Sequence, residues 1–338
     1  MSAPPEPRRV FDPAGEDELD RTLRPRTFEE FVGQGRVTEN LRIHLRAADA
    51  RGESPDHVLL TGLPGLGKTT LAHLIALSRG VPIRITSGPA LERARDLVGV
   101  LSNLKRGDVL FIDEIHRLPA ALEEILYSAM EDFRVDLTID KGPHARILNL
   151  RLHPYTLVGA TTREGLLSSP LRARFGVLER LEPYAAEELE VVLDRSARLL
   201  GLALEPEARA LLARRARGIP RIVNRFLRRV RDLGQVRGEN AITESIAREG
   251  LSMLGVDEEG LEEIDRQILR AILRCGGAPV GLKTVAIAVG EESDTIEEVY
   301  EPFLIREGYL QKTPRGRLAT ARARKLLRVH GSEERRLF

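Results

Sequence analysis

The chain has 338 residues, of which 42% are hydrophobic and 30% charged, a composition typical of a folded globular protein of two or three domains. Lys and Arg total 52 and Asp and Glu total 51, so the net charge of +1 favours no class of partner. Aromatic residues make up 4% and Trp is absent, which argues against an aromatic platform for stacking single-stranded bases.

Residues 1–20 are expected to form a flexible tail. The segment Met1–Arg9 is rich in Pro and lacks the apolar run of a secretory signal. No segment approaches the roughly 20 apolar residues of a membrane-spanning helix, so we expect a cytoplasmic protein that contacts no membrane. The single cysteine, Cys275, excludes an intrachain disulfide and a cysteine-based zinc site, and its apolar helical setting predicts a core thiol.

Residues 21–184 predict a large α/β domain built on a parallel sheet. Short apolar runs alternate there with helical patterns, as in strands that are joined by crossover helices. The expected strands are His57–Thr61, Val81–Thr86, Asp108–Asp113, Thr156–Thr161 and Val177–Leu181.

The first strand leads into a phosphate-binding loop. The run Gly62–Thr69 reads GLPGLGKT and matches the pattern G-x-x-x-x-G-K-S/T. Gly65 and Gly67 let backbone N–H groups turn toward phosphates at the positive end of the following helix. Lys68 is expected to reach the β- and γ-phosphates, and the Thr69 hydroxyl to ligate Mg²⁺. The loop therefore predicts an ATP site.

The third strand ends in two acids, Asp113 and Glu114. Ligands of parallel sheets bind at the carboxyl ends of the strands, so both acids are expected beside the loop. We expect Asp113 to hold Mg²⁺ through water and Glu114 to orient and deprotonate the attacking water.

A β-hairpin is predicted inside this domain at about 134–152. The alternating apolar residues are Val135, Leu137 and Ile139 on one strand and Leu148, Leu150 and Leu152 on the other. A small hairpin cannot bury all of them, so Leu148 and Leu150 are predicted to bind a partner. The alternative is that the hairpin packs onto its own domain.

The fourth strand ends in the run Gly159–Arg163, which reads GATTR. A polar side chain there suits contact with the γ-phosphate or the attacking water, and we assign this role to Thr161 rather than Thr162; strand capping is the alternative. Beyond it, Arg174 is expected to reach the γ-phosphate of a neighbouring subunit, whereas Arg172 is expected to form a surface salt bridge.

Residues 185–256 predict a small, wholly helical domain, with Arg221 at the start of a helix where it can touch the phosphates. Residues 257–330 predict three helices followed by a β-hairpin, the winged-helix arrangement, and 331–338 a tail. The basic turn of the wing, with Lys312, Arg315 and Arg317, is expected to hold DNA phosphates; a solvated loop is the alternative.

In this order the motifs resemble the RuvB family of AAA+ ATPases. The resemblance runs from about Leu23 to Thr320 and rests on several stretches: Leu23–Pro25, Phe31–Gln34, Thr86–Pro89, Phe111–Leu118, Ala129–Phe133, Gly159–Arg163, Arg225–Asp232 and Lys312–Arg317. It implies an ATP- and Mg²⁺-dependent motor that drives branch migration in recombination and repair. It also implies a homo-hexameric ring on double-stranded DNA and four-way junctions, and a RuvA-like junction-binding partner that the hairpin contacts.

The resemblance also assigns roles to particular residues. Leu23, Arg24 and Tyr184 fall in the adenine pocket. Contacts to phosphate or metal fall to Gly65, Lys68, Thr69, Thr70, Arg174 and Arg221. The run Glu131, Asp132 and Phe133 borders nucleotide at a subunit edge, and Lys312 and Arg317 contact DNA.

A second reading remains open at this point. A clamp-loader subunit or a replication initiator uses ATP as an assembly switch, and an initiator also joins an AAA+ module to a winged helix. The inserted hairpin and the short wing Thr313–Arg317 favour the motor.

Overall fold

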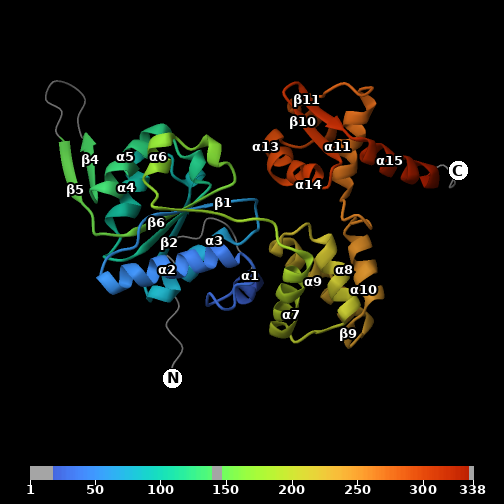
Figure 1. The fold of residues 1–338 in the computed structure, drawn as a ribbon, viewed down its shortest axis with the longest axis horizontal. Coiled ribbons are helices and arrows are strands. Elements are labelled where there is room, and N and C mark those ends of the chain that lie inside the picture. The colour runs from blue at the N-terminus through green and yellow to red at the C-terminus, as the bar shows by residue number, and fades with distance from the viewer. Residues whose placement is uncertain (1–17, 139–146, 335–338) are drawn as a thin grey trace. The chain divides into compact units, whose positions relative to one another are not determined.

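A computed structural model describes residues 18–138 and 147–334 of the chain (Figure 1). The chain divides into two compact units, Met1–Glu182 and Pro183–Phe338. The expected tail 1–20 lies largely outside the described residues, and helix α1 (Glu18–Leu23) begins within it. Among the described residues no helix has the length and apolar character needed to cross a membrane.

The first unit contains the expected five-stranded sheet, in the order β2-β3-β6-β1-β7, with every pair of neighbours parallel. The strands are β1 (Val58–Thr61), β2 (Ile83–Ser87), β3 (Val109–Asp113), β6 (Thr156–Thr161) and β7 (Val177–Arg180). All residues of β1 and β6 are buried, which explains their unbroken apolar character. Because β1, β3 and β6 are neighbours, their carboxyl ends meet at one edge of the sheet.

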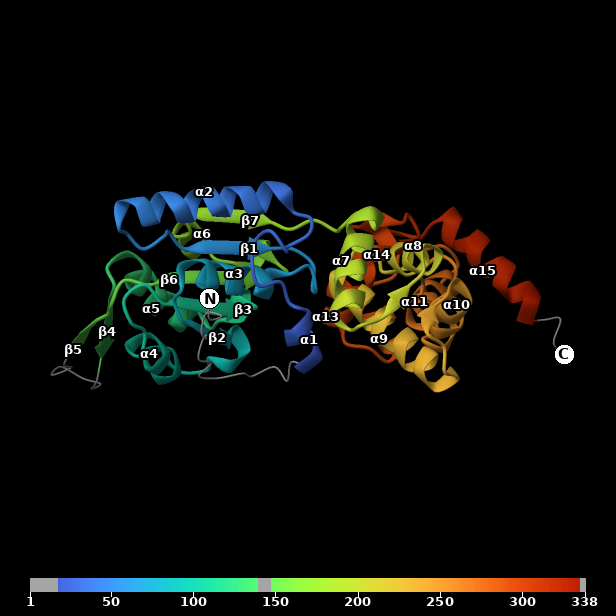
Figure 2. The same ribbon diagram turned by 90° about the horizontal axis from the view of Figure 1, so that it is seen from below.

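Helices cover this sheet. They are α2 (Gly35–Arg51), α3 (Lys68–Arg79), α4 (Ala94–Ser102), α5 (Ala120–Glu131) and α6 (Ser169–Ala173), with short 3-10 turns at Gly88–Ala90, Ile115–Arg117 and Glu164–Leu166. Helix α2 lies along edge strand β7 (Figure 2), where Asn40 and Arg36 contact the buried carboxylate of Glu179 at 3.0 and 3.1 Å. This helix covers the edge that β7 would otherwise leave open.

The inserted hairpin is present as β4 (Arg134–Thr138) and β5 (Ile147–Arg151), paired antiparallel, and it projects from the first unit in Figure 1. Its predicted turn lies outside the described residues. Val135 is fully buried, and Leu150 and Leu152 pack against the same core cluster. The base of the hairpin therefore packs onto its own domain, as the alternative interpretation held.

The second unit begins with the lid, whose helices are α7 (Ala186–Leu199), α8 (Pro206–Arg215), α9 (Pro220–Arg237) and α10 (Glu244–Met253). Two short strands, β8 (Ala203–Leu204) and β9 (Ala241–Ile242), pair in parallel, so the prediction of a wholly helical lid was wrong in this detail. Each strand has two residues, too few to produce a period-2 pattern in the sequence.

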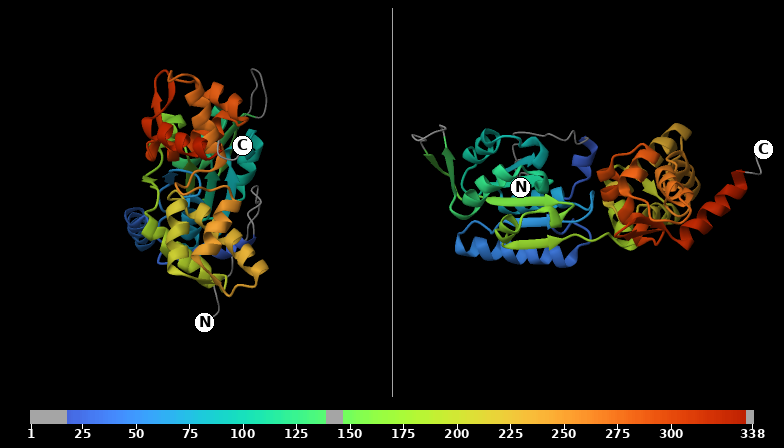
Figure 3. Two further views of the ribbon diagram at one scale, coloured as in Figure 1. Left: turned by 90° about the vertical axis from the view of Figure 1, so that its right-hand side faces the viewer. Right: turned by 90° about the horizontal axis from the view of Figure 1, so that it is seen from above.

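The winged helix follows, with helices α11 (Glu263–Arg274), α12 (Leu282–Val289), α13 (Ser293–Thr295) and α14 (Glu301–Arg306), and strands β10 (Leu310–Thr313) and β11 (Gly316–Ala319). A π-turn at Ile296–Tyr300 joins α13 to α14, because Pro302 lacks the N–H that an unbroken α-helix would use. Helix α15 (Ala321–Glu334) continues past the expected boundary at 330 and extends from its unit (Figure 3).

The prediction of a buried Cys275 was wrong, since this thiol is exposed. Helix α11 ends at Arg274, and Cys275 is its C-cap, beyond the buried stripe that Ile268, Leu269 and Ile272 form.

Candidate functional site

The loop after β1 has the backbone that a phosphate cradle requires. Gly62, Gly65 and Gly67 have φ angles of 140°, 81° and 105°, a region that residues with a Cβ rarely adopt. A Cβ at Gly62 would lie 2.7 Å from the carbonyl oxygen of Leu181. The loop therefore needs glycine for both conformation and space.

Helix α3 begins at Lys68, with Gly67 as its N-cap and no acid in its first turn. Lys68 is buried, and its Nζ donates to the carbonyls of Gly62 and Leu63 at 2.7 and 3.0 Å, so the ammonium lies across the loop. Thr69 and Thr70 occupy the same first turn and are partly exposed. The helix N-terminus and the ammonium together form an anion-binding site.

Asp113 and Glu114 lie at the carboxyl end of β3, the second strand from the loop. Glu114 has a φ of 48°, a left-handed conformation that is uncommon outside glycine, and its N–H donates to Asp113 Oδ1 at 3.0 Å. The neighbouring Gly88 permits this turn, because a Cβ there would lie 2.4 Å from the Glu114 carbonyl oxygen. Backbone strain at a carboxylate of this kind is a common property of functional sites.

A small network fixes the Glu114 carboxylate. Its Oε2 accepts from the Thr162 hydroxyl at 3.3 Å and lies 3.3 Å from Nδ1 of His116. The same His116 Nδ1 lies 2.8 Å from Oγ1 of Thr161. Thr161 is fully buried and also accepts from the N–H of Arg163 at 2.9 Å.

These contacts bear on the assignment of the two threonines. Thr161 belongs to the buried end of β6 and contacts His116 and the N–H of Arg163, and its role at the γ-phosphate stays a prediction. Thr162 is partly exposed and touches the proposed base directly. His116, which the sequence reading left without a role, links both.

Arg174 is docked on its own domain. Its Nη2 lies 3.0 Å from Glu131 Oε2, its Nη1 donates to the carbonyl of Pro170 at 2.8 Å, and its guanidinium stacks on the ring of Tyr127. Arg172 pairs with Glu164 at 3.7 Å and is exposed, which is the surface salt bridge expected for it.

The run Glu131 to Phe133 divides into different surroundings. Asp132 is exposed and pairs with Arg134 at 3.2 Å. Phe133 has a φ of 48° and packs edge-on against Tyr155, with ring centroids 5.9 Å apart. Of these three residues, Glu131 pairs with Arg174, and Phe133 packs against the hydrophobic core of the domain.

The remaining expected nucleotide contacts lie in both units. Leu23 is buried and Arg24 partly buried in the first unit. In the second unit Tyr184 is buried and its N–H donates to the Gly218 carbonyl at 2.9 Å, while Arg221 is exposed in the first turn of α9.

In the wing, Gly316 has a φ of 136°, and a Cβ on it would lie 2.5 Å from the Val280 carbonyl oxygen. Arg315 is exposed at the tip. Lys312 Nζ is exposed and pairs with Glu297 at 2.6 Å. Arg317 instead points into the domain, with an 11% exposed side chain that binds buried Glu301 at 2.6 Å. The basic turn therefore offers two accessible cations, while Arg317 has a structural partner.

Models of known protein families match all three domains of this chain. The family model described as the Holliday junction DNA helicase RuvB P-loop domain matches residues 23–181, the RuvB AAA lid domain matches 184–257, and the RuvB C-terminal winged helix domain matches 258–328. The chain belongs to the RuvB family.

Individual members of this family are similar to the chain over most of its length. The Holliday junction branch migration complex subunit RuvB of Myxococcus xanthus is 59% identical over 305 residues, which is 90% of this chain and 89% of that protein. The RuvB subunit of Thermobifida fusca is 57% identical over 306 residues, covering 90% and 87%. The solved structure of the Thermotoga maritima RuvB Holliday junction branch migration motor aligns with a TM-score of 0.83 and 48% identity, over 91% of this chain and 98% of that one.

Membership in the RuvB family explains why the P-loop, the lid and the wing occur in this order, and it confirms the resemblance inferred from the motifs. From the sequence alone, Thr162 is only the alternative to Thr161 and His116 has no role, whereas the structure has both in contact with Glu114. One feature of the sequence could have indicated the contact of Thr162. Thr161 is the last residue of an apolar strand, so Thr162 is the first residue whose side chain can lie outside the sheet.

Proposed function

We propose that this chain is an ATP-driven motor that moves Holliday junctions by branch migration. One observation carries the proposal. A left-handed Glu114 is held by Thr162 and His116 at the strand edge next to a phosphate-binding loop, in a chain that matches the RuvB family over all three of its domains. A catalytic carboxylate fixed beside a phosphate cradle is suited to hydrolysis as well as to binding.

In this proposal the loop holds the ATP phosphates through Gly65, Gly67 and Lys68, and Thr70 supports them from α3. Leu23, Arg24 and Tyr184 form the adenine pocket, and Arg221 contacts phosphate from the lid. No group of three or more His, Cys, Asp or Glu side chains suited to a metal occurs among the described residues. Thr69 and, through water, Asp113 would hold a Mg²⁺, which would neutralise charge on the ATP phosphates.

The chemical step divides among residues whose positions fit their roles. Glu114 accepts the proton of the attacking water, and Thr162 orients this water or the γ-phosphate. Arg174 leaves Glu131 and contacts the γ-phosphate of the adjacent subunit, where its charge stabilises the transition state. This step requires a ring, and we propose a homo-hexamer.

We propose that the ring encircles duplex DNA in the cytoplasm and holds its phosphates through Lys312 and Arg315. Two phosphate contacts per subunit give affinity without sequence preference, as a motor on any sequence needs. The outer part of the hairpin, with Leu148, is proposed to bind a RuvA-like protein, while Leu150 helps to anchor the hairpin to its domain.

Electron microscopy of the full chain with duplex DNA, Mg²⁺ and a slowly hydrolysed ATP analogue tests the assembly. A closed six-fold ring around DNA is expected. An open spiral or a pentamer would instead support the clamp-loader or initiator type of switch, which the family assignment does not favour.

The hairpin is tested by adding RuvA. Leu148→Ser is expected to keep the ATPase activity on DNA alone and to lose the stimulation by RuvA. Leu150→Ser serves as a contrasting variant, because it removes a core contact and should lower thermal stability. Full stimulation of the Leu148 variant would exclude a contact at this position.

A further inference from the structure

Arg217 is held by the winged helix through its side chain and its main chain. Its Nε donates to the Gly260 carbonyl at 3.0 Å, and its Nη2 donates to Asp265 Oδ2 at 2.6 Å. The guanidinium lies over the ring of Phe303, 4.4 Å from its centroid. The carbonyl of Arg217 accepts from Arg306 Nη2 at 2.9 Å. The ion pair is buried, since Asp265 has no exposed surface and Arg217 has 5%.

The turn that carries Arg217 also contacts the proposed nucleotide residues of the lid. Arg217 and Gly218 have φ angles of 59° and 75°, two consecutive left-handed residues that reverse the chain. The Gly218 carbonyl accepts from the Tyr184 N–H at 2.9 Å. Helix α9 begins at Pro220, which places Arg221 in its first turn. Tyr184 thus contacts the residue next to Arg217, and Arg221 follows Arg217 by four residues in the same turn and helix start.

Helix α14 connects Arg217 with the wing. Phe303 and Arg306, which grip Arg217, lie on this helix. Glu301 begins it, is 2% exposed, and accepts from Nε and Nη2 of Arg317 on β11 at 2.6 and 3.2 Å. In the wing, Arg317 is the direct cross-strand partner of Lys312. One short helix thus contacts the lid turn and the DNA-facing strands.

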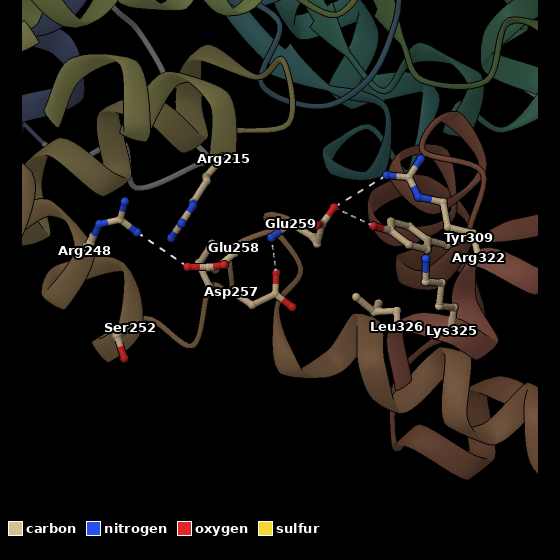
Figure 4. A pocket seen from close by; sticks show the side chains of 11 residues that line it. Arg215, Arg248, Ser252, Asp257, Glu258, Glu259, Tyr309, Arg322, Lys325 and Leu326 are labelled. Carbon is tan, nitrogen blue, oxygen red and sulfur yellow. Dashed lines mark hydrogen bonds and ion pairs between the residues drawn. The ribbon is translucent and has the colours of Figure 1, made fainter. Parts of the chain in front are cut away.

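Other ion pairs also join the lid and its linker to the winged helix: Arg225 pairs with Glu262, and Arg266 with Asp257, each at 2.6 Å. The linker residues Glu258 and Glu259 pair with Arg248 and Arg322, each at 3.6 Å, around a cavity of about 900 Å³ (Figure 4). All four side chains are half or more exposed. Exposed pairs are screened by water and contribute little, whereas removing one partner of a buried pair leaves an uncompensated charge and is strongly destabilising. The pair of Arg217 and Asp265 is more deeply buried than any of these pairs, so we take Arg217 as the link between the lid and the winged helix.

We propose that Arg217 is a positioning residue that couples the nucleotide state of the lid to the DNA affinity of the winged helix, acting through α14. The inference rests on the proposed function. Nucleotide contact at Tyr184 and Arg221 shifts the turn, the buried pair carries the shift to α14, and α14 moves Arg317 and the wing.

The test measures the dissociation constant of the full chain for a labelled duplex with ADP and with a non-hydrolysable ATP analogue. The ratio of the two constants reports the coupling, and by linkage it equals the factor by which DNA changes the relative affinity for the two nucleotides. We expect a ratio of at least about fivefold in the wild type.

Two variants weaken the link with little change of shape. Arg217→Lys keeps the charge but loses the planar fork that spans two acceptors and stacks on Phe303. Asp265→Asn removes the negative charge of the carboxylate that pairs with Arg217. Both are expected to bring the ratio within about twofold of one, while nucleotide affinity without DNA is unchanged. Arg214→Gln, at an exposed position in the last turn of α8 and three residues before Arg217, is the matched control and should keep the wild-type ratio.

Thermal unfolding monitors the fold, and the uncharged pair Arg217→Gln with Asp265→Asn replaces any single variant that does not fold. Wild-type ratios in the variants, or a wild-type ratio of one, would overturn the coupling while ATP turnover and duplex binding still supported the motor. A wild-type chain with neither turnover nor duplex binding would refute the proposed function itself and the coupling with it.

Discussion

The guanidinium of Arg174 lies 3.0 Å from the carboxylate of Glu131 in the same chain. Glu131 is 58% exposed, so this ion pair is well solvated and contributes little to stability. The arginine can therefore leave Glu131 for a phosphate at small cost. The guanidinium also stacks on the ring of Tyr127, 4.5 Å from its centroid.

We expect Arg174→Ala to lower the ATPase rate of the assembled ring by about a thousandfold, since an arginine that contacts the transferred phosphate contributes at least that much. Mixed with wild type, it should depress activity by more than its share of subunits, because its target lies in the next subunit. ATPase measurements across a series of mixing ratios test this. Arg172→Ala, which breaks an exposed pair, is the control and should stay within about twofold of wild type. A linear mixing curve would make Arg174 a local residue.

The two threonines after β6 should separate function from stability. Thr162→Val is expected to keep ATP binding and to reduce turnover by about a hundredfold or more, because it removes a polar contact to Glu114 that acts during the reaction. Thr161→Val should destabilise the fold by about 1–3 kcal/mol, because it leaves buried partners unsatisfied. Nucleotide titration, single-turnover hydrolysis and thermal unfolding distinguish them. If Thr161→Val were stable and inactive while Thr162→Val remained active, the original assignment of Thr161 would hold.

In the wing, substitutions of Lys312 and Arg315 should lower the affinity for DNA, whereas a substitution of Arg317 should lower the stability of the fold. Replacing Lys312 and Arg315 with Ala should lower the slope of log K against log salt by about two at most, at roughly 0.9 per phosphate contact. Arg317→Ala should instead cost about 3–5 kcal/mol of stability, because it leaves Glu301 buried and unpaired. Salt titrations of duplex binding and thermal unfolding measure both effects. An unchanged salt slope in the double variant would make the turn a solvated loop.

Much of this arrangement could be predicted because its signals are local. The glycines of Gly62–Thr69 predict a turn with positive φ angles, and the apolar run before Asp113 predicts a buried strand. In the fold, the loop and Asp113 both follow the carboxyl ends of strands in the same sheet. What could not be predicted depends on tertiary partners. Arg317 is a basic residue on an exposed turn, and only the fold shows that buried Glu301 binds it.

The hairpin shows the same limit. Alternation in the sequence reveals two faces, but it does not reveal that Val135 and Leu150 face their own core. Arg217 carries no signal in the sequence that separates it from its neighbours, whereas its left-handed backbone and its bond to Asp265 place it against the winged helix.

His57 predicts a pH dependence of stability in the first unit. Its Nε2–H donates to the Met130 carbonyl at 3.1 Å, and its Nδ1 accepts from the Leu157 N–H at 2.9 Å, so both nitrogens are used by the neutral ring. Burial lowers the pKa of His57 below its usual 6.5. The unfolded chain therefore binds the extra proton first, and stability is lost as the pH falls below 6.5.

Between the pKa of His57 in the unfolded chain and its pKa in the folded chain, the free energy of unfolding falls by at most about 1.4 kcal/mol for each pH unit. Urea unfolding of the wild type and of His57→Gln at a series of pH values from neutral to mildly acidic measures it. The variant should be less stable near neutral pH and should show a smaller loss in acid. An equal loss in both proteins would assign the effect to other groups.

The central claim is that Glu114 converts ATP binding into movement of a junction. The most direct measurement is ATP-dependent branch migration of a synthetic four-way junction with Mg²⁺ and RuvA, for the wild type, Glu114→Gln and Lys68→Ala. The wild type is expected to dissociate the junction. Glu114→Gln should bind ATP and leave the junction intact, and Lys68→Ala should also lose ATP binding, because its ammonium holds the ground-state phosphates. No ATP-dependent migration by the wild type, or migration at the wild-type rate by Glu114→Gln, would contradict the account.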